Sequence, residues 1–587
     1  MSNQTSKRHL RPKLYLWWRK IGGTFSWALI ATAVVLTLAL GFLGFAEPDG
    51  TPRPVTTRLY LAIQLFTLES GAFAEAPEVN WKLEVARWAG FIAAFGTLIN
   101  TLLTVFAKQL HRLYRSRQSG HAVIIGAGSG CLQLATDLMK SGRRVCVIDK
   151  DSHSENLSAL TSAGAVECIG DACDPSILSG AGIRKAAMVF ILAGDDVTNL
   201  AIANSIGIAC DASGDVHSTQ AFIDISDPRL FLATCRNTQT VDFFRFSRIE
   251  NGAREFFKVH NPDQGGISID APEQVHLIII GRNSMARALI NQALASMHYA
   301  NGVNAALTLI TDLAVKERQS MLCKMPEFEL CAETHFYDGD TSTPDLRKVL
   351  SHAFHSPEQL VTVAICETDF ERSLDAFQNI APLIGRSRTK VVIQSHHSDD
   401  RRICVNFQEF PHIQTEVFGQ SETSCSEEHV IGEALDELAR RIHESYVVKR
   451  ISNGDSPPNT PALLPWEDFP IEYKVMNRQQ ADHIAVKLRA LNIDFVACDE
   501  PDSKWPRTIT NGEFDALARA EHCRWAACKR VAGWRFGGER DDDLRIHPDL
   551  VSWSSLSEAV QEYDREPVQN LPKLLGSIGY QLINQEQ

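Results

Sequence analysis

The chain has little positive charge for its size and no cysteine in its first 130 residues. Its 587 residues include 58 Lys and Arg against 71 Asp and Glu, a formal net charge of -13. Nucleic-acid binding needs a basic face, so we expect no nucleic-acid partner. None of the 14 cysteines has a C-x-x-C spacing, which argues against a disulfide framework or a metal site. Single cores stop growing at about 250–300 residues, so the chain must comprise several domains.

Two stretches near the N-terminus contain no charged residue at all. They cover residues 25–45 and residues 88–107, which are 21 and 20 positions long. At about 1.5 Å of rise per residue, a helix of either length crosses a hydrocarbon core of roughly 30 Å. We therefore predict transmembrane helices at residues 25–46 and 85–107.

A cleaved signal peptide is the alternative for the first stretch, because Gly44-Phe45-Ala46 offers a small-x-small cleavage site. The apolar run is longer than the roughly 7–15 residues of a signal peptide core. In addition, 24 residues precede it. Both features favour a retained helix.

Basic residues precede the first predicted span and follow the second. Residues 1–24 form a basic tail, and residues 108–119 form a basic segment that we expect to be a gating linker. Lys and Arg favour the cytoplasmic side of a membrane. We therefore expect both termini in the cytoplasm and the chain in the inner (cytoplasmic) membrane, in contact with membrane lipid. The flanking residues are Lys7, Arg8, Arg11, Lys13, Arg19, Lys20, Lys108, Arg112, Arg115 and Arg117.

The predicted external loop, residues 47–84, contains an apolar segment too short to cross a membrane. This segment covers residues 56–66 and is followed by "TLESG" at residues 67–71. An apolar run of this length is a core helix, an interfacial segment or a re-entrant helix. Two spans that enclose a re-entrant helix indicate a pore-loop channel, in which four identical subunits, a homotetramer, surround one axis.

The residues after the short segment resemble the selectivity filter of bacterial voltage-gated sodium channels. They also occupy the place of the potassium-channel filter and keep its Thr and its last Gly. The resemblance implies a ring of four Glu69 carboxylates that attracts partly hydrated cations. The alternatives are an exposed loop carboxylate at Glu69, or potassium conduction through an atypical filter. The five predicted filter residues are Thr67, Leu68, Glu69, Ser70 and Gly71.

Polar residues recur at helical spacing along the second predicted span. They are Thr97, Asn100, Thr101 and Thr104. Polar side chains inside a membrane usually face a bundle interior or a watery path. We predict that this face lines the pore.

The sequence from His121 to Asp151 reads as a strand, a glycine turn, a helix and a second strand. In dinucleotide-binding folds the first glycine permits a tight turn, the second lets backbone approach a pyrophosphate, and an acid binds the ribose. Gly126, Gly128 and Asp149 fill these roles. The third glycine position holds Cys131, and Gly130 comes one residue early.

The continuation of this segment resembles the RCK domain, also called TrkA-N. The motifs are Gly170-Asp171 and "DDVTN" at residues 195–199, and we assign the domain to residues 120–262. The resemblance implies a cytosolic ring that binds NAD or another adenine nucleotide as a gating ligand. The predicted nucleotide-binding residues are Gly126, Gly128, Gly130, Asp149, Asp171, Asp196 and Asn199.

Two other interpretations share this fingerprint. One is a Rossmann-like scaffold that has lost its ligand. The other is an oxidoreductase, which would need a substrate domain with a positioned acid or base. The sequence shows no such constellation, so we expect no enzyme and no catalytic residues.

The strand–turn–helix pattern restarts at Val275 and continues through further predicted strands. Only Gly281 remains of the glycine motif. We predict a second, degenerate RCK-like domain at residues 274–446, with a structural role in the ring. A linker at residues 447–464 follows, because "SNGDSPPNTP" breaks regular structure.

Residues 465–583 resemble the RyR domain, the small α-helical repeat of ryanodine receptors. The motifs are Glu521, Arg524-Trp525, Gly533-Trp534, His547-Pro548 and "YDR" at residues 563–565. Tryptophan and arginine together suit an anionic ligand that carries a ring. Alternatively, the tryptophans are core anchors and the arginines pair with neighbouring acids. The ligand candidates are Glu521, Trp525, Arg530, Trp534, Arg535 and His547.

These patterns together predict two transmembrane helices with a re-entrant pore loop, then tandem α/β Rossmann-like RCK domains, then a small α-helical RyR domain. The predicted function is a ligand-gated cation channel that passes sodium, or sodium and potassium with little selectivity, and that is gated by a nucleotide-type ligand. The alternatives are a potassium channel with an atypical filter and a membrane-anchored nucleotide sensor without a pore.

Overall fold

The computed structural model describes most of the chain. Within helix α5 it describes only the backbone of residues 103–116. The described residues are 23–45, 53–67, 80–116, 119–211, 218–235, 237–238, 240–385, 387–395, 410, 413, 415–419, 424–431, 436–452, 454, 461–466 and 468–585.

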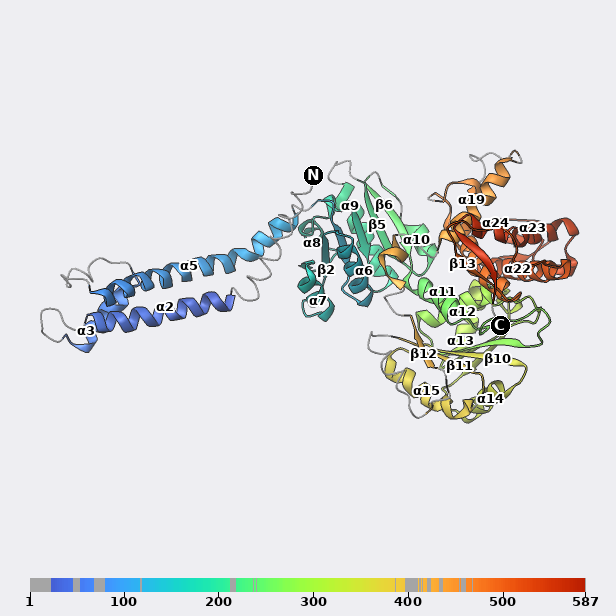
Figure 1. Ribbon diagram of the computed structural model, residues 1–587, viewed down its shortest axis with the longest axis horizontal. Coiled ribbons are helices and arrows are strands. Elements are labelled where there is room, and N and C mark those ends of the chain that lie inside the picture. Colours follow the sequence, from blue (N-terminus) through green and yellow to red (C-terminus); the bar gives the residue numbers. More distant parts are fainter. Residues whose placement is uncertain are drawn as a thin grey trace.

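The N-terminal part is an arm of helices that projects from the rest of the chain (Figure 1). The long helices α2 (Gly23–Gly44) and α5 (Trp81–Ser116) pack side by side, and the short helix α3 (Val55–Gln64) packs at their far end. Segments Ser26–Gly44 and Trp81–Leu102 are long and apolar enough to cross a membrane. This confirms the prediction of two such helices in length and composition.

Glycines let α3 approach the long helices closely. A Cβ added at Gly90 of α5 would lie 2.7 Å from the backbone oxygen of Leu65, just after α3. A Cβ added at Gly41 of α2 would lie 3.0 Å from the Cβ of Ala62. Leu61 and Leu65 are buried in the same cluster. The short segment therefore forms a helix whose end is held between the two long ones.

Helix α5 differs from the predicted linker, because it continues unbroken to Ser116. Most of residues 108–119 is thus a direct extension of the second apolar helix. The first strand of the next domain begins at Ala122. The apolar helix and the first α/β domain are therefore close neighbours along the chain.

The first α/β domain is a six-stranded sheet in the order β3-β2-β1-β4-β5-β6, with parallel pairing throughout. Its inner strands β1 and β2 are runs of buried apolar residues, as a sheet covered on both faces requires. This is the doubly wound strand order. Its elements are β1 (Ala122–Ile125), α6 (Ser129–Lys140), β2 (Val145–Asp149), α7 (Glu155–Ala163), β3 (Val166–Ile169), α8 (Pro175–Gly180), β4 (Met188–Ile191), α9 (Asp196–Asp211), β5 (Thr219–Asp224), α10 (Pro228–Thr234), β6 (Val241–Phe246) and α11 (Arg248–Val259).

The second α/β domain repeats this topology. Its sheet has the order β12-β11-β10-β7-β8-β9, again with parallel pairing. The prediction of a second Rossmann-like sheet is confirmed. Its elements are β7 (Gln274–Ile280), α12 (Ser284–Ser296), β8 (Ala306–Thr311), α13 (Ala314–Lys324), β9 (Glu333–Asp338), α14 (Pro344–His355), β10 (Gln359–Ile365), α15 (Phe370–Ile384), β11 (Lys390–Gln394) and β12 (Thr415–Phe418).

The C-terminal module is mainly helical but also contains two small sheets. Strands β13 and β16 pair antiparallel, and the two-residue strands β14 and β15 pair parallel. Its elements are α20 (Ile471–Asp482), α21 (Ile484–Arg489), β13 (Ile493–Ala497), α22 (Asn511–Val531), β14 (Arg535–Phe536), β15 (Ile546–His547), α23 (Glu558–Gln569), α24 (Leu571–Gly576) and β16 (Tyr580–Asn584).

The helix that spans residue 446, the predicted end of the second RCK-like domain, packs against the C-terminal module. Helix α19 (Glu437–Ser452) crosses the predicted boundary at residue 446, and its buried residues Ala439 and Ile442 lie in the core of the C-terminal module beside Trp466. The hydrophobic face of α19 therefore assigns it to this module. The polar breaker that indicated a linker begins only where α19 ends.

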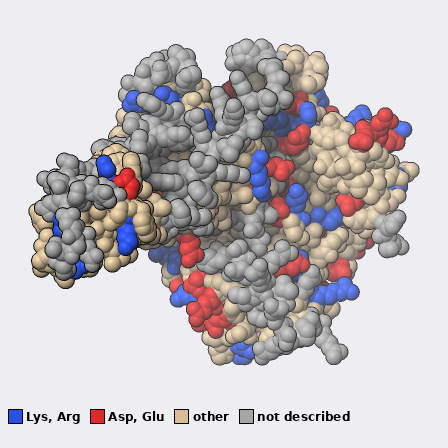
Figure 2. All heavy atoms as spheres, turned by 60° about the vertical axis from the view of Figure 1, so that its left-hand side comes forward, with Lys and Arg blue, Asp and Glu red and all other residues tan. Residues whose placement is uncertain are grey.

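Buried ion pairs join the C-terminal module to the α/β part. Arg254 of α11 bonds Asp482 of α20 at 2.8 Å and Asp436 at 2.7 Å. Arg489 pairs with Asp263 at 2.8 Å. On the face shown in Figure 2, positive and negative side chains are interspersed over the sheet-containing part among the described residues.

Candidate functional site

The glycine turn after β1 has the geometry that a phosphate-binding loop needs. Gly126 has φ +98°, and a Cβ added there would lie 2.6 Å from the backbone oxygen of Leu192. Only glycine fits this backbone without strain. Gly128 faces open space, because an added Cβ would meet no atom within 4 Å among the described residues. Backbone at Gly128 can thus be approached from outside.

The N-terminus of α6 opens onto this space without a side-chain cap. Gly128 is its N-cap residue and makes no capping bond, and the first turn contains no acidic residue. The first N–H groups of a helix carry a partial positive charge and bind anions readily. The corresponding helix α12 is instead capped by the Asn283 side chain, which accepts from Ala286 N at 3.0 Å. Of these two corresponding helices, only α6 in the first α/β domain has an N-terminus without a side-chain cap.

Asp149 ends β2 beside the turn. Its carboxylate accepts hydrogen bonds from the backbone N–H of Ala127 and, at 2.7 Å, from that of Asp151. The side chain of Asn156 donates to the Ala127 oxygen at 3.0 Å, which fixes the turn further. A carboxylate offers about four acceptor positions, so Asp149 can still accept from a ribose hydroxyl.

The other predicted nucleotide-binding residues follow strands at the carboxyl edge of the sheet. Their side chains mainly form hydrogen bonds or ion pairs with neighbouring loops. Asp196 accepts from the backbone N–H groups of Ser226 and Asp227 at 3.0 and 3.1 Å. Asn199 is buried and donates to the Asp224 oxygen at 2.8 Å. Asp171 is exposed and pairs with Lys150 at 3.1 Å. The "DDVTN" motif thus fixes the loops after β4 and β5.

Gly130 and Cys131 have separate roles. Cys131 is fully buried in the core beneath α6, where burial raises the pKa of its thiol. A Cβ added at Gly130 would lie 3.1 Å from Arg248 Cδ and 3.2 Å from Cys425 Sγ. Gly130 therefore lets α11 and the segment around Cys425 approach the helix end.

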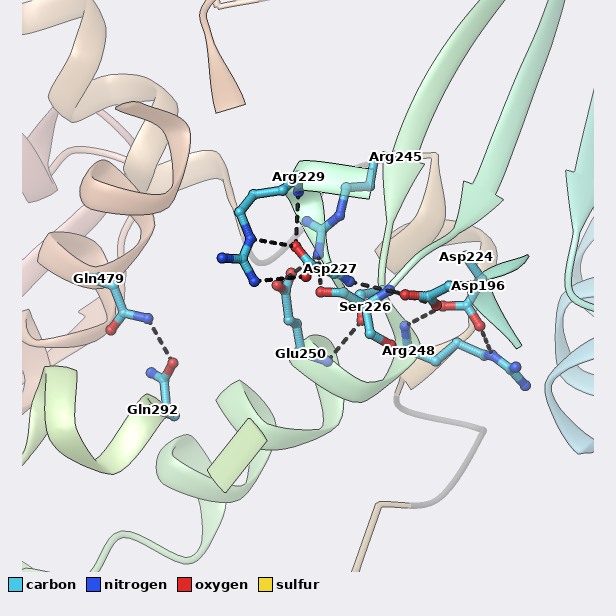
Figure 3. A network of polar contacts seen from close by, with 11 residues as sticks. Asp196, Asp224, Ser226, Asp227, Arg229, Arg245, Arg248, Glu250, Gln292 and Gln479 are labelled. Carbon is cyan, nitrogen blue, oxygen red and sulfur yellow. Dashed lines mark hydrogen bonds and ion pairs between the residues drawn. The ribbon is translucent and has the colours of Figure 1, made fainter. Parts of the chain in front are cut away.

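Sequence reasoning missed Arg248, because 118 positions separate it from Gly130 and no spacing rule connects them. Its Nε donates to Asp224 Oδ2 at 2.7 Å, and its backbone N–H donates to Asp224 Oδ1 at 3.0 Å. Burial alone would lower the pKa of Arg248, but Asp224 raises it, so the guanidinium is charged. Figure 3 shows this side chain pointing away from the Arg229–Asp227 pair.

These residues together fit the phosphates and ribose of a nucleotide. The glycine turn lets a pyrophosphate approach, the uncapped helix end supplies N–H donors, and Asp149 supplies a ribose acceptor. Arg248 adds a fixed positive charge beside the same helix end.

In the C-terminal module, two of the six predicted ligand residues are engaged elsewhere. Glu521 is buried and bonds Arg524 at 2.7 Å and Lys487. Arg530 donates to the Leu550 oxygen at 3.0 Å and lies 3.5 Å from Glu327 of the second α/β domain. Both residues therefore stabilise the fold and the domain contact.

The other four predicted residues lie near the end of α22. The half-buried rings of Trp525 and Trp534 approach His547, with centroids 5.1 and 6.1 Å away. The backbone of Arg535 pairs with Ile546 beside them. Lys529 was not predicted; its Nζ lies 4.1 Å from the Trp534 ring centroid, and burial lowers its pKa. The cluster thus combines stacking surfaces with positive charge.

The predicted pore residues are only partly described. Thr67 follows α3 and donates to the Gln64 oxygen at 2.8 Å, whereas Leu68, Glu69, Ser70 and Gly71 lie outside the described residues.

The polar residues predicted to share one face of the second span differ in burial. Thr97 and Thr101 are exposed, and each donates to the carbonyl four residues earlier, at 2.6 and 2.8 Å. Asn100 is buried and faces α2, 3.5 Å from Ser26 Oγ. The side chain of Thr104 is outside the described part of the chain. Asn100 therefore contacts the neighbouring helix, whereas Thr97 and Thr101 remain candidates for the pore.

Comparisons with known families support two of these domains. Residues 122–211 match the family model of the TrkA-N domain, and residues 510–584 match that of the RyR domain. The two families indicated by the sequence motifs are confirmed for these segments.

Solved structures show weaker likenesses. The GsuK channel bound to ADP shares 13% identity, covering 70% of this chain and 97% of that chain with a TM-score of 0.38. The GsuK channel bound to NAD shares 12% identity, covering 70% and 83% with a TM-score of 0.36. A dipicolinate synthase chain from Bacillus halodurans shares 11% identity, covering 55% and 98% with a TM-score of 0.21. TM-scores this low carry no argument for the function of this chain.

Proposed function

We propose that the protein is a ligand-gated cation channel of the inner membrane, with its gate controlled by the TrkA-N domain. The observation that carries this proposal is the continuity of α5. The apolar part of this helix, Trp81–Leu102, runs on to Ser116, and strand β1 begins at Ala122. The TrkA-N domain thus begins within six residues of the end of the apolar helix.

The arrangement of the arm supports a pore loop. Helix α3 is too short to span, and its end is held between α2 and α5 by close contacts at Gly41 and Gly90. Large apolar side chains on both long helices are exposed, among them Leu36, Trp88 and Phe95. Lipid and the neighbouring subunits of a homotetramer would cover them. In this assembly Glu69 forms the selectivity ring, and the channel passes sodium, or sodium and potassium with little selectivity.

The gating ligand is NAD or another adenine nucleotide at the glycine turn. Gly126 and Gly128 admit the phosphates, the α6 N–H groups bind them, and Asp149 binds the ribose. The bound group supplies binding free energy that can differ between closed and open assemblies. A ligand shifts a gate only through such a difference in affinity.

A second ligand site in the RyR domain is supported by the cluster of Trp525, Trp534, His547 and Lys529. Its aromatic rings offer stacking for a base, and its cation suits a phosphate. Phe536 N donates to Glu327 Oε1 at 3.2 Å, so this site adjoins the second α/β domain. Occupancy could therefore be sensed by the α/β part of the chain.

The Glu69→Ala variant tests the pore. We expect its reversal potential across a sodium chloride gradient to move toward zero, because the carboxylate ring that favours cations over anions is lost. Purified protein in liposome patches, with ADP or NAD on the cytosolic face, provides the measurement. Glu84→Ala, on the described part of α5, is the matched control and should leave the reversal potential unchanged.

The alternatives predict other outcomes. A potassium channel with an atypical filter reverses near the potassium equilibrium potential in the wild type. A membrane-anchored nucleotide sensor without a pore carries no current with any nucleotide, although it binds one.

The Trp534→Leu variant tests the RyR site. We expect wild-type protein to bind two ADP molecules per chain and the variant to bind one, because the stacking ring is lost. Stacking on one aromatic ring contributes about 1–3 kcal/mol. Isothermal titration calorimetry gives the stoichiometry, with Trp505→Leu in the same domain as the control. A stoichiometry of two in Trp534→Leu would contradict the second site.

A further inference from the structure

Arg248 joins the end of β5 to the open end of α6. It is the first residue of α11, and both oxygens of the Asp224 carboxylate accept hydrogen bonds from it. Its Cδ and Nη1 lie 3.1 and 3.2 Å from the position of a Cβ on Gly130, in the first turn of α6. The side chain therefore reaches the helix end that the nucleotide site uses.

The two Nη groups of this guanidinium remain available. Among the described residues, Nε donates to Asp224, and neither Nη group has a hydrogen-bond partner. A guanidinium has five N–H donors, so four are left for a ligand. Two such donors form a planar fork that matches phosphate oxygens.

Two positive groups near the N-terminus of α6 favour the binding of an anion. The partial positive charge of the α6 N-terminus and the full charge of Arg248 lie together, and the first turn of α6 has no acidic residue. Asp224 is bonded to Arg248 through Nε, and Nη1 is the guanidinium nitrogen that lies near the first turn of α6.

We propose that Arg248 binds the phosphate of the ligand and makes this site select phosphorylated adenine compounds over adenosine. This inference rests on the proposed nucleotide site of the TrkA-N domain. It adds to the family fingerprint a residue that the glycine motif does not contain. Arg248 remains bonded to Asp224 through Nε while its Nη groups contact the phosphate.

The test compares ADP with adenosine in calorimetric titrations of the full-length protein. In Arg248→Gln we expect the ADP Kd at this site to rise about 10- to 100-fold, the range for a lost charge-assisted contact, with adenosine affinity changed by less than about twofold. Arg229→Gln is the matched control, because Arg229 pairs with Asp227 at 2.8 Å, and the Arg248 side chain points away from this pair (Figure 3). It should change neither affinity.

A second variant covers the case in which Arg248→Gln leaves Asp224 buried without its partner and unfolds the domain. Asp224→Asn with Arg248→Gln removes both charges, so no unpaired carboxylate is left. The same loss of ADP affinity, with adenosine retained, is expected. An unchanged ADP Kd, or equal losses for ADP and adenosine, would overturn the role of Arg248.

Failure of the proposed nucleotide site can be distinguished from failure of the proposed role of Arg248. If wild-type protein and the Arg229→Gln control bind neither compound at the TrkA-N domain, the nucleotide site itself is wrong, and the role of Arg248 falls with it. If wild-type protein binds ADP and the Arg248 variants bind it equally well, only the present inference is wrong.

Discussion

Glu521→Gln is expected to destabilise the C-terminal module by about 3–5 kcal/mol, the cost of breaking a buried ion cluster by removing one partner. Glu521 is 2% exposed and bonds both Arg524 and Lys487, which are 3% and 2% exposed. Without this carboxylate, two buried cations have lost their shared counter-ion. Urea unfolding followed by tryptophan fluorescence would measure the loss.

The matched control is Asp542→Asn, which breaks an exposed ion pair. Arg540 and Asp542 lie 2.7 Å apart, with side chains 55% and 58% exposed. An exposed pair contributes about 0–1 kcal/mol, so the control should barely move the unfolding midpoint. Equal midpoints for Glu521→Gln and wild type would show that the cluster does not stabilise the module.

The pH dependence of the unfolding free energy tests the same ion cluster around Glu521. Burial alone would raise the pKa of Glu521, but the charges of Arg524 and Lys487 outweigh it and hold the pKa well below its ordinary value of 4.5. A depressed carboxyl pKa contributes stability that is complete above 4.5 and is lost as the pH falls toward the folded-state pKa. The difference between wild type and Glu521→Gln should therefore be constant above pH 5 and shrink below about pH 4.5.

Gly126→Ala is expected to cost about 1–2 kcal/mol in backbone strain alone, because the residue has a left-handed conformation. The clash adds to this, since the new Cβ would lie 2.6 Å from the Leu192 oxygen. The turn would open, and we expect both thermal stability and ADP binding at the TrkA-N domain to be lost. Differential scanning fluorimetry and calorimetric titration measure the two effects.

Gly128→Ala separates folding from binding. Gly128 has φ −66°, which alanine adopts freely, and its Cβ would point into open space. The variant should keep its melting temperature and lose ADP affinity, because the methyl group occupies the path of the phosphate. If Gly128→Ala binds ADP normally, the phosphate does not lie at this turn.

The sequence predicted the parts of the molecule that depend on local pattern. Charge-free stretches gave the two apolar helices, and the strand–glycine–helix pattern gave the first α/β domain. The second sheet was also predictable from its apolar strands, although Gly281 alone remains of the glycine motif. Helical and strand periodicity are local properties, which explains this success.

Contacts between distant segments could not be predicted. Glu521 and Arg530 looked like ligand residues beside tryptophans, but burial pairs Glu521 with Lys487 of α21 and places Arg530 near Glu327. Arg248 has no motif that connects it to Gly130. The extension of α5 to Ser116 was hidden because the basic residues that indicated a linker also suit an exposed helix. In each case the deciding partner lies outside the sequence window.

The central claim, that a nucleotide at the TrkA-N domain controls an ion pore, is tested most directly by current through single liposome patches. ADP or NAD would be added to and removed from the cytosolic face, first with wild type and then with Gly128→Ala. We predict a reversible change in cation current in the wild type and none in the variant, with both proteins folded. Wild-type protein that binds the nucleotide but carries no current in its presence or absence would contradict the claim.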